Sequence, residues 1–139
     1  MLKYKMRKKI GYPREVVFKT LRDRQTDLNN RVPNIRKAWI VQQRKTSEHE
    51  TYVKVDISGR ANIPKLLRRA IKPSMLRWYV HQYWNSHDYT CRFVIESQYF
   101  RKNLDARGEW QYLEGQGGDT NVVIDNSLHV DATGVRGVP

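Results

Sequence analysis

The N-terminal part of this chain changes pattern in a way that restricts the folds open to it. Residues Leu2 to Ile10 alternate between apolar and basic side chains, which is typical of a strand with one buried face. Gly11-Tyr12-Pro13 then leads into an apolar stripe with helical spacing, which Val32-Pro33 ends before extended sequence resumes at Ile35. One early strand, a helical interruption and a long run of strands together predict a sheet that curls around something.

The rest of the chain is typical of antiparallel strands joined in hairpins. Three pairs are predicted: Ile35 to Lys45 with Thr51 to Ser58, Leu76 to Asn85 with Tyr89 to Ser97, and Ala106 to Leu113 with Thr120 to Val130. Between the first two pairs, Pro64 to Ile71 has helical composition, and Pro73 follows it. We expect one curved antiparallel sheet in which the first strand pairs beside the last.

Length and composition favour one intracellular domain, residues 1–139. A chain of 139 residues buries roughly two thirds of its unfolded surface on folding, without metal or disulfide staples. The sequence contains neither a long apolar run nor an apolar signal-peptide core, so we expect it to be neither membrane-spanning nor secreted. Its single cysteine, Cys91, excludes an internal disulfide and suits a reducing compartment. A cytoplasmic location is therefore expected.

The charge of the chain is strongly basic and unevenly distributed. The net charge is +12, with +16 in residues 1–107 and −4 in residues 108–139. The densest basic stretch, Arg60 to Arg77, has six positive residues and no acid, and we assign Arg68, Arg69 and Lys72 to an anionic surface such as a membrane. A solvated face that keeps the domain soluble is the alternative. Nucleic acid is not the expected partner, because the sequence has no recognition helix and no aromatic RNA-binding motif.

Several local motifs carry a family resemblance. Tyr12-Pro13-Arg14-Glu15-Val16-Val17-Phe18 opens the first helix, Asp23 lies near its end, and Val32-Pro33 precedes the second strand. With the order of elements, these residues resemble the START and Bet v 1-like (SRPBCC) superfamily, which includes lipid-transfer domains, plant allergens and polyketide cyclases. The segments from Ile63-Pro64 to Pro73, Leu76-Arg77-Trp78 and Tyr83-Trp84-Asn85 are similar to a bacterial branch of unknown function.

The resemblance implies an α+β helix-grip fold: a curved antiparallel sheet, two short N-terminal helices and a long C-terminal helix across the concave face. This chain stops at Thr133-Gly134-Val135-Arg136-Gly137-Val138-Pro139, which is similar to the loop leading into that last helix. We therefore expect a domain that is incomplete at its C-terminus, through truncation or as a natural product. A concave face left uncovered would favour a homodimer that pairs concave face with concave face.

Alternation within the later strands predicts which side chains face inward. We assign Trp78, Val80, Gln82, Trp84, Cys91, Phe93, Ile95 and Trp110 to the lining of a cavity on the concave face. Such a lining suits an apolar ligand, because binding pockets are mostly hydrophobic with a few orienting polar groups. The alternative is that these side chains fill the core completely.

The sequence offers little to support catalysis. His49, His81, His87 and His129 lie at unrelated spacings without a metal-binding motif, so no metal or other cofactor is expected. Cys91 lies in the middle of a strand, where a small buried apolar side chain is the ordinary role. The glycines of Gly115-Gln116-Gly117-Gly118 are explained by a hairpin turn. No catalytic residue is assigned.

Three functions remain open. The resemblance and the inward residues favour binding or transport of a hydrophobic small molecule or lipid. The alternative is an enzyme, a cyclase or dehydratase acting on a polyketide-like substrate, in which the cavity orients the substrate and excludes water. The third is a basic nucleic-acid-binding module. Convergent buried polar side chains would favour the enzyme, a dry apolar cavity would favour carriage, and a flat basic stripe away from any cavity would favour nucleic acid.

Overall fold

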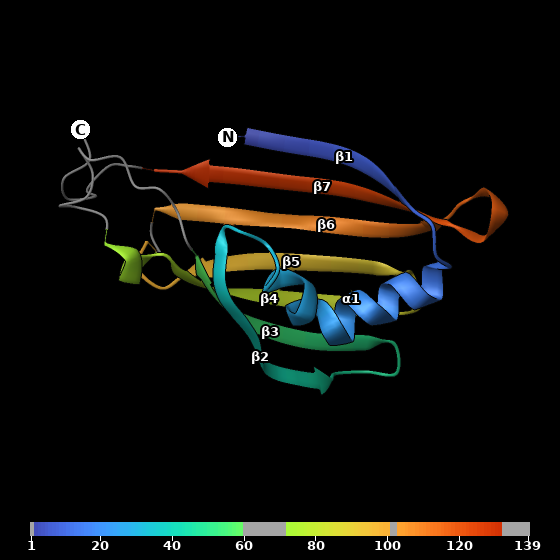
Figure 1. The fold of residues 1–139 in the computed structure, drawn as a ribbon, viewed down its shortest axis with the longest axis horizontal. Helices are drawn as coiled ribbons and strands as arrows, with labels where there is room; N and C mark the ends of the chain where they lie inside the picture. Colours follow the sequence, from blue (N-terminus) through green and yellow to red (C-terminus); the bar gives the residue numbers. More distant parts are fainter. Residues whose placement is uncertain (1, 60–71, 101–102, 132–139) are drawn as a thin grey trace.

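A computed structural model describes residues 2–59, 72–100 and 103–131 of the chain. Within these ranges, one α-helix, seven strands and two single-turn 3-10 helices follow one another along the sequence (Figure 1). The elements are β1 Leu2–Ile10, α1 Arg14–Asn29, β2 Ile35–Lys45, β3 Glu50–Gly59, η2 Pro73–Met75, β4 Arg77–Asn85, β5 Thr90–Ser97, β6 Leu104–Glu114, η3 Gln116–Gly118 and β7 Thr120–Val130.

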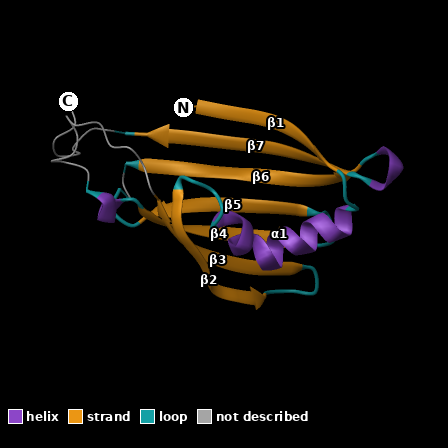
Figure 2. Cartoon of the chain, viewed as in Figure 1, coloured by secondary structure: helices purple, strands orange, loops and turns teal. Residues whose placement is uncertain are grey.

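The seven strands form one antiparallel sheet in the order β1-β7-β6-β5-β4-β3-β2. The predicted pairing of the first strand with the last is confirmed, with Leu2 opposite Leu128 and Ile10 opposite Thr120. The sheet is curved, and α1 lies across one of its faces (Figure 2). The curved antiparallel sheet expected for a helix-grip fold is therefore present.

The expected count of two short N-terminal helices is not supported, because one helix with a kink at Arg24 occupies this region. Helix α1 has 16 residues and runs from Arg14 to Asn29. A kink at Arg24, where φ is −127° and ψ is 22°, divides it into two helical stretches, the second of which ends at Asn29. No glycine or proline lies between Arg14 and Asn29, so no residue in this stretch forces the helix to end.

Phe18 anchors α1 to the concave face of the sheet. Its side chain is 1% exposed. The ring makes edge-to-face contacts with three other aromatic rings, at centroid distances of 5.3, 5.3 and 5.6 Å, from Trp84, Tyr89 and Tyr112. Aromatic pairs in this geometry contribute about 0.5–1.5 kcal/mol each beyond the burial of their surface. Phe18 thereby joins α1 to β4, to the residue before β5 and to β6.

Hydrogen bonds from the sheet hold the segments at both ends of α1. The buried Thr120 at the start of β7 donates its hydroxyl hydrogen to the carbonyl oxygen of Tyr12, at 2.7 Å. At the other end, the Asn30 amide accepts from the backbone N–H of Ala38 at 2.8 Å and donates to the Ala38 carbonyl at 3.0 Å. The loop before the helix is thus tied to β7, and its C-cap residue is tied to β2.

Two parts of the sequence-based prediction fall on residues outside the described ranges. These are the short helix expected at residues 64–71 and the C-terminal segment of residues 132–139. Of the helices in the described ranges, none has the length and apolar character needed to cross a bilayer.

Replacing Phe18 with alanine should destabilise the fold strongly, because it removes the ring that joins α1 to three places on the sheet. Phe→Ala changes in cores cost about 3–5 kcal/mol of unfolding free energy. Urea unfolding followed by tryptophan fluorescence measures the loss. The matched control is Val16→Ala on the same helix, where a side chain that is 50% exposed should change stability by less than about 0.5 kcal/mol. Similar losses for both variants would refute this role of Phe18.

Candidate functional site

A cavity of about 270 Å³ lies between α1 and the concave face of the sheet. Its walls come from the C-terminal half of α1 and from strands β3 to β6. The lining residues are Leu21, Gln25, Asn29, Ile57, Val80, Gln82, Trp84, Cys91, Phe93, Trp110 and Tyr112. The volume is slightly smaller than that of typical small-molecule pockets, which are about 300–1,000 Å³.

The structure brings together six of the eight residues assigned to the cavity from sequence. Val80, Gln82, Trp84, Cys91, Phe93 and Trp110 all line it. Trp78 and Ile95 do not line this cavity, although both are partly buried and pack against the hydrophobic core. All eight residues therefore lie on the core side of the sheet, as the alternation of inward and outward side chains predicts. Whether a ligand occupies the cavity remains a prediction.

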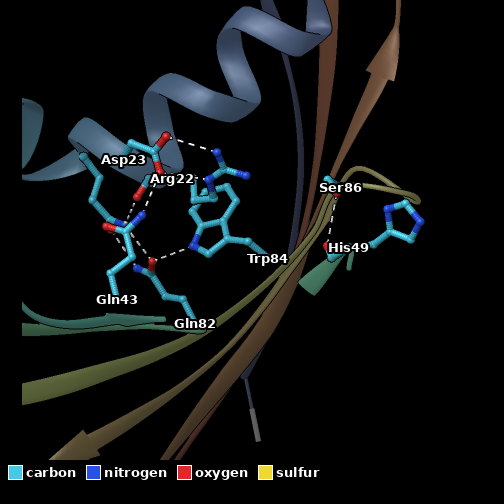
Figure 3. Close-up of polar contacts among 8 residues, drawn as sticks. Arg22, Asp23, Gln43, His49, Gln82, Trp84 and Ser86 are labelled. Carbon is cyan, nitrogen blue, oxygen red and sulfur yellow. Dashed lines mark hydrogen bonds and ion pairs between the residues drawn. The ribbon is translucent and has the colours of Figure 1, made fainter. Parts of the chain in front are cut away.

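Two buried glutamines form a reciprocal hydrogen-bonded pair in the otherwise largely apolar wall. The amide nitrogen of Gln25 donates to Oε1 of Gln82, and the amide nitrogen of Gln82 donates to Oε1 of Gln25, each at 2.7 Å. The Trp84 indole N–H also donates to Oε1 of Gln82, at 2.9 Å. Figure 3 shows Gln82 and Trp84 below α1, with a dashed line between the Trp84 indole and Gln82. The pair is 7% and 9% exposed for Gln25 and Gln82 respectively.

The hydrogen bonds of this pair leave one donor and one acceptor unused. An amide group offers two N–H donors and two acceptor lone pairs. Oε1 of Gln82 accepts two bonds, and the Gln25 nitrogen donates to Gln82 and, at 3.3 Å, to the carbonyl of Arg22. Among the hydrogen bonds within the described residues, one N–H of Gln82 and one lone pair of Gln25 Oε1 remain for a further partner.

Gly108 of β6 leaves space for the side chains of Phe93 and Asn126. A Cβ atom at Gly108 would lie 2.8 Å from the ring of Phe93 and would also overlap the side-chain oxygen of Asn126. That oxygen accepts a hydrogen bond from the Trp110 indole N–H at 3.1 Å. The missing side chain therefore lets Phe93 and Trp110 adopt their positions along the cavity.

The titratable groups of the cavity are held in their neutral forms. Burial raises the pKa of the Cys91 thiol well above its ordinary value, and burial likewise raises the pKa of the Tyr112 phenol. The other described lining residues are amides, apolar side chains and tryptophans. Among the lining residues that the structure describes, none is thus a carboxylate, an imidazole or an amine that could act as a general base.

An ion pair on α1 supports the helix next to the cavity. Arg22 forms two hydrogen bonds to Asp23, at 2.8 and 3.1 Å, and Gln43 of β2 donates to the same carboxylate at 2.8 Å (Figure 3). The hydrogen bond from Arg22, followed by that from Gln43, lowers the pKa of Asp23. This stabilisation is present above the carboxyl's unfolded pKa and is lost as the pH falls through the lowered folded value.

The residues assigned to an anionic surface are not brought into this site. Arg68 and Arg69 lie outside the described residues, and Lys72 is exposed before η2. The anionic-surface role therefore remains a prediction. Of the histidines, His81 lies on the outer face, between the Tyr52 hydroxyl at 2.6 Å and the Glu96 carboxylate at 3.0 Å. In the described part of the chain, no three potential metal ligands lie together.

Five lining residues were not assigned from sequence: Leu21, Gln25, Asn29, Ile57 and Tyr112. Gln25 follows Phe18 by seven residues and Leu21 by four, so helical spacing alone places it on the same buried stripe. Tyr112 follows Trp110 by two residues and therefore shares its face of β6. Both signals were present in the sequence. The pairing of Gln25 with Gln82 was not, because the two residues are 57 positions apart.

Comparisons with known proteins identify the fold. No protein-family model matches this chain, and no curated protein matches it. Among solved structures, it is similar to the ZhuI aromatase/cyclase from Streptomyces sp. R1128, with a TM-score of 0.67 and 13% identity over 99% of this chain and 73% of that chain. It is also similar to Ara h 8.0201, with a TM-score of 0.59 and 14% identity over 99% of this chain and 82% of that chain.

A third solved structure, DR_A0006 from Deinococcus radiodurans, gives a TM-score of 0.50 and 12% identity over 94% of this chain and 84% of that chain. At these identities the likeness concerns the fold alone. All three neighbours are members of the same fold group. The chain therefore has the Bet v 1-like, or SRPBCC, fold.

Proposed function

We propose that the cavity under α1 binds a hydrophobic small molecule or lipid that carries one polar group. The observation that carries this proposal is the Gln25–Gln82 pair, which presents a spare donor and a spare acceptor within a wall of apolar side chains. A carbonyl or hydroxyl group on the ligand would use these groups, while rings or alkyl carbons would contact Phe93 and Trp110. Pockets that are apolar with a few placed polar groups bind ligands in one orientation.

The fold supports this proposal only in general terms. One neighbour is described as an aromatase/cyclase, and the chain shares its architecture at 13% identity. A cyclase-like enzyme is therefore the second candidate. The convergent glutamines would orient a substrate, but amides do not exchange protons at neutral pH, and the raised pKa values of Cys91 and Tyr112 keep both groups neutral. Binding without acid or base chemistry is the simpler account of this lining.

A second copy of the chain is a further proposed partner. On β1, Leu2 is 71% exposed and Tyr4 is 51% exposed, and both share the side of the sheet that faces α1. Large apolar side chains lose about 1.5–3 kcal/mol each when they stay in water instead of being buried. We therefore keep the homodimer as a proposal, with light scattering as its measurement.

The proposed orientation can be tested with two tricyclic probes that differ by one carbonyl group, 9-fluorenone and fluorene. Quenching of tryptophan fluorescence reports their affinities, because Trp84 and Trp110 line the cavity. In Gln82→Leu, the ratio of the two affinities should fall by roughly two- to tenfold, since one net hydrogen bond is worth about 0.5–1.5 kcal/mol. Taking a ratio removes effects that both probes share, such as a change in stability.

The matched control is Gln111→Leu, which changes an exposed glutamine on β6 and should leave the ratio as in the wild type. An unchanged ratio in Gln82→Leu would contradict the orienting role of the pair. If neither probe binds saturably to the wild type, the proposed function itself is wrong.

Filling the cavity should weaken binding of both probes. Phe93→Trp adds volume to a lining residue, and we expect at least a tenfold loss of affinity for 9-fluorenone, about 1.4 kcal/mol. Val94→Trp is the matched control on the next residue of β5, because Val94 is 39% exposed and points to the outer face. Equal affinities for the two variants would place the binding site elsewhere.

Alkylation of Cys91 separates binding from nucleophilic catalysis. Because burial raises the pKa of this thiol, the folded protein should resist iodoacetamide even near pH 8.5, where an unfolded cysteine is about half ionised. The protein unfolded in urea should react at the ordinary rate, as followed by mass spectrometry. Rapid modification of the folded protein would reveal an accessible thiolate and would favour the enzyme.

A further inference from the structure

The face of the sheet opposite the cavity carries a row of aromatic and basic side chains across four strands. Arg44 of β2 lies opposite Tyr52 of β3, Tyr52 lies opposite Tyr83 of β4, and Tyr83 lies opposite Arg92 of β5. We call these four residues the outer row. Neighbouring strands are about 4.8 Å apart, so the row spans a continuous surface about 14 Å wide.

The rings and cations of the outer row contact one another. The rings of Tyr52 and Tyr83 lie 5.4 Å apart between centroids, tilted by 45°. The guanidinium carbon of Arg44 is 5.3 Å from the Tyr52 ring centre, and that of Arg92 is 5.6 Å from the Tyr83 ring centre. Cation–π contacts of this kind hold both arginines near the surface. The two central rings are thus flanked by two positioned positive charges.

A second basic and aromatic pair extends the outer row along the same face. The ammonium group of Lys54 lies 4.1 Å from the ring centre of Tyr79. Lys54 follows Tyr52 by two residues on β3, and Tyr79 precedes Tyr83 by four on β4, so all of them share the outer face. The face therefore repeats the same combination of a flat ring with a cation.

Acidic groups on this face pair with some of its basic side chains and leave others free. Glu96 contacts His81 at 3.0 Å, and Glu109 of β6 lies opposite Arg92. The buried carboxylate of Asp56, which is 3% exposed, is paired by the two hydrogen bonds from Arg77, at 2.6 and 3.1 Å. Arg92 has a carboxylate of Glu50 at 3.6 Å, with 64% of the Arg92 side chain exposed. Among the described residues, neither Arg44 nor Lys54 forms an ion pair. Arg44 has a cation–π contact with Tyr52, and Lys54 has one with Tyr79. Their charges remain available to an anion.

From this arrangement we infer that the outer row and the Lys54 pair bind single-stranded nucleic acid. A single strand offers phosphates to Arg44, Lys54 and Arg92 and unstacked bases to the rings of Tyr52 and Tyr83. Proteins bind single strands through basic grooves combined with aromatic stacking platforms, and such platforms occur on open sheet faces. A duplex hides its bases, and anionic lipids offer charge without rings to stack. The charge of +12 complements a polyanion in general, and the rings favour the single strand.

This surface is independent of the cavity, because the two lie on opposite faces of one sheet. Gln82 points toward α1, whereas its neighbour Tyr83 belongs to the outer row. The inference therefore goes beyond the proposed function, and either can fail without the other.

The test uses fluorescence anisotropy of a fluorescein-labelled oligothymidylate over a series of salt concentrations. Competition with a duplex of mixed sequence and sedimentation with phosphatidylcholine–phosphatidylserine vesicles distinguish the other polyanions. We expect the wild type to prefer the single strand over both. In Tyr52→Leu/Tyr83→Leu the affinity should fall about tenfold or more, because each stacked base contributes a large share of binding.

The charged residues are tested by the salt dependence. In Arg44→Gln/Arg92→Gln, the slope of log affinity against log salt should decrease in magnitude by about 1.4, the value for two phosphate contacts on a single strand. The matched control is Lys19→Gln/Arg24→Gln, which removes two exposed charges from α1 on the other face and should retain the wild-type slope. The thermal unfolding transition shows that each variant is folded.

Several results would overturn the inference. One is wild-type affinity in the tyrosine variant, and another is an equal change of slope in the α1 control. Binding to vesicles or to the duplex in preference to the single strand would reassign the surface to a general anionic partner. Because the arginine variant changes only exposed side chains, it decides the question if the tyrosine variant fails to fold.

Discussion

The contact of Phe18 with three rings is the interaction on which the rest of the molecule depends. Trp84, Tyr89 and Tyr112 come from separate strands or turns, yet all three meet one side chain of α1. The hydrogen bonds at Tyr12 and Asn30 fix where the helix begins and ends, but they leave its rotation open. The buried ring removes that freedom, because only one rotation of α1 places Phe18 between the three aromatic side chains.

The cavity and its polar pair follow from this fixed rotation. Gln25 lies seven residues after Phe18, just beyond the kink at Arg24, and its buried side chain also faces the sheet. There it meets Gln82, and both amides are buried. A buried amide without a partner costs about 1–3 kcal/mol, so the two glutamines penalise any other rotation of α1. The same pair that specifies the packing of the helix also supplies the groups that a ligand would contact. Structure and binding thus rely on one set of hydrogen bonds.

The alternation of side chains and the turn residues predicted much of this fold. The features that they did not predict depend on contacts between residues distant in sequence. The bounds of β2 and β7 agree with prediction because alternation and turn residues act within a few positions. The inward position of Gln82 followed from its place between Val80 and Trp84. The count of two N-terminal helices, which the resemblance suggested, is not supported, and the helix instead has a kink at Arg24, where the sequence has no breaker residue. The Gln25 partner and the outer row could not be predicted, since each depends on which residues the sheet register places opposite one another.

The register of the strands determines which residues lie on each of the two faces of the sheet. On β3, β4 and β5, each outward residue has an inward neighbour: Tyr52 beside Val53, Tyr83 beside Gln82, and Arg92 beside Cys91. Because side chains alternate strictly along a strand, a slip of one residue would exchange the two faces. It would bury the arginines and expose the cavity wall, and burying an unpaired charge is far more costly than losing a hydrogen bond. The basic outer face therefore constrains folding. A shifted register would be unfavourable for the inward apolar residues alone, and burying the arginines makes it more so.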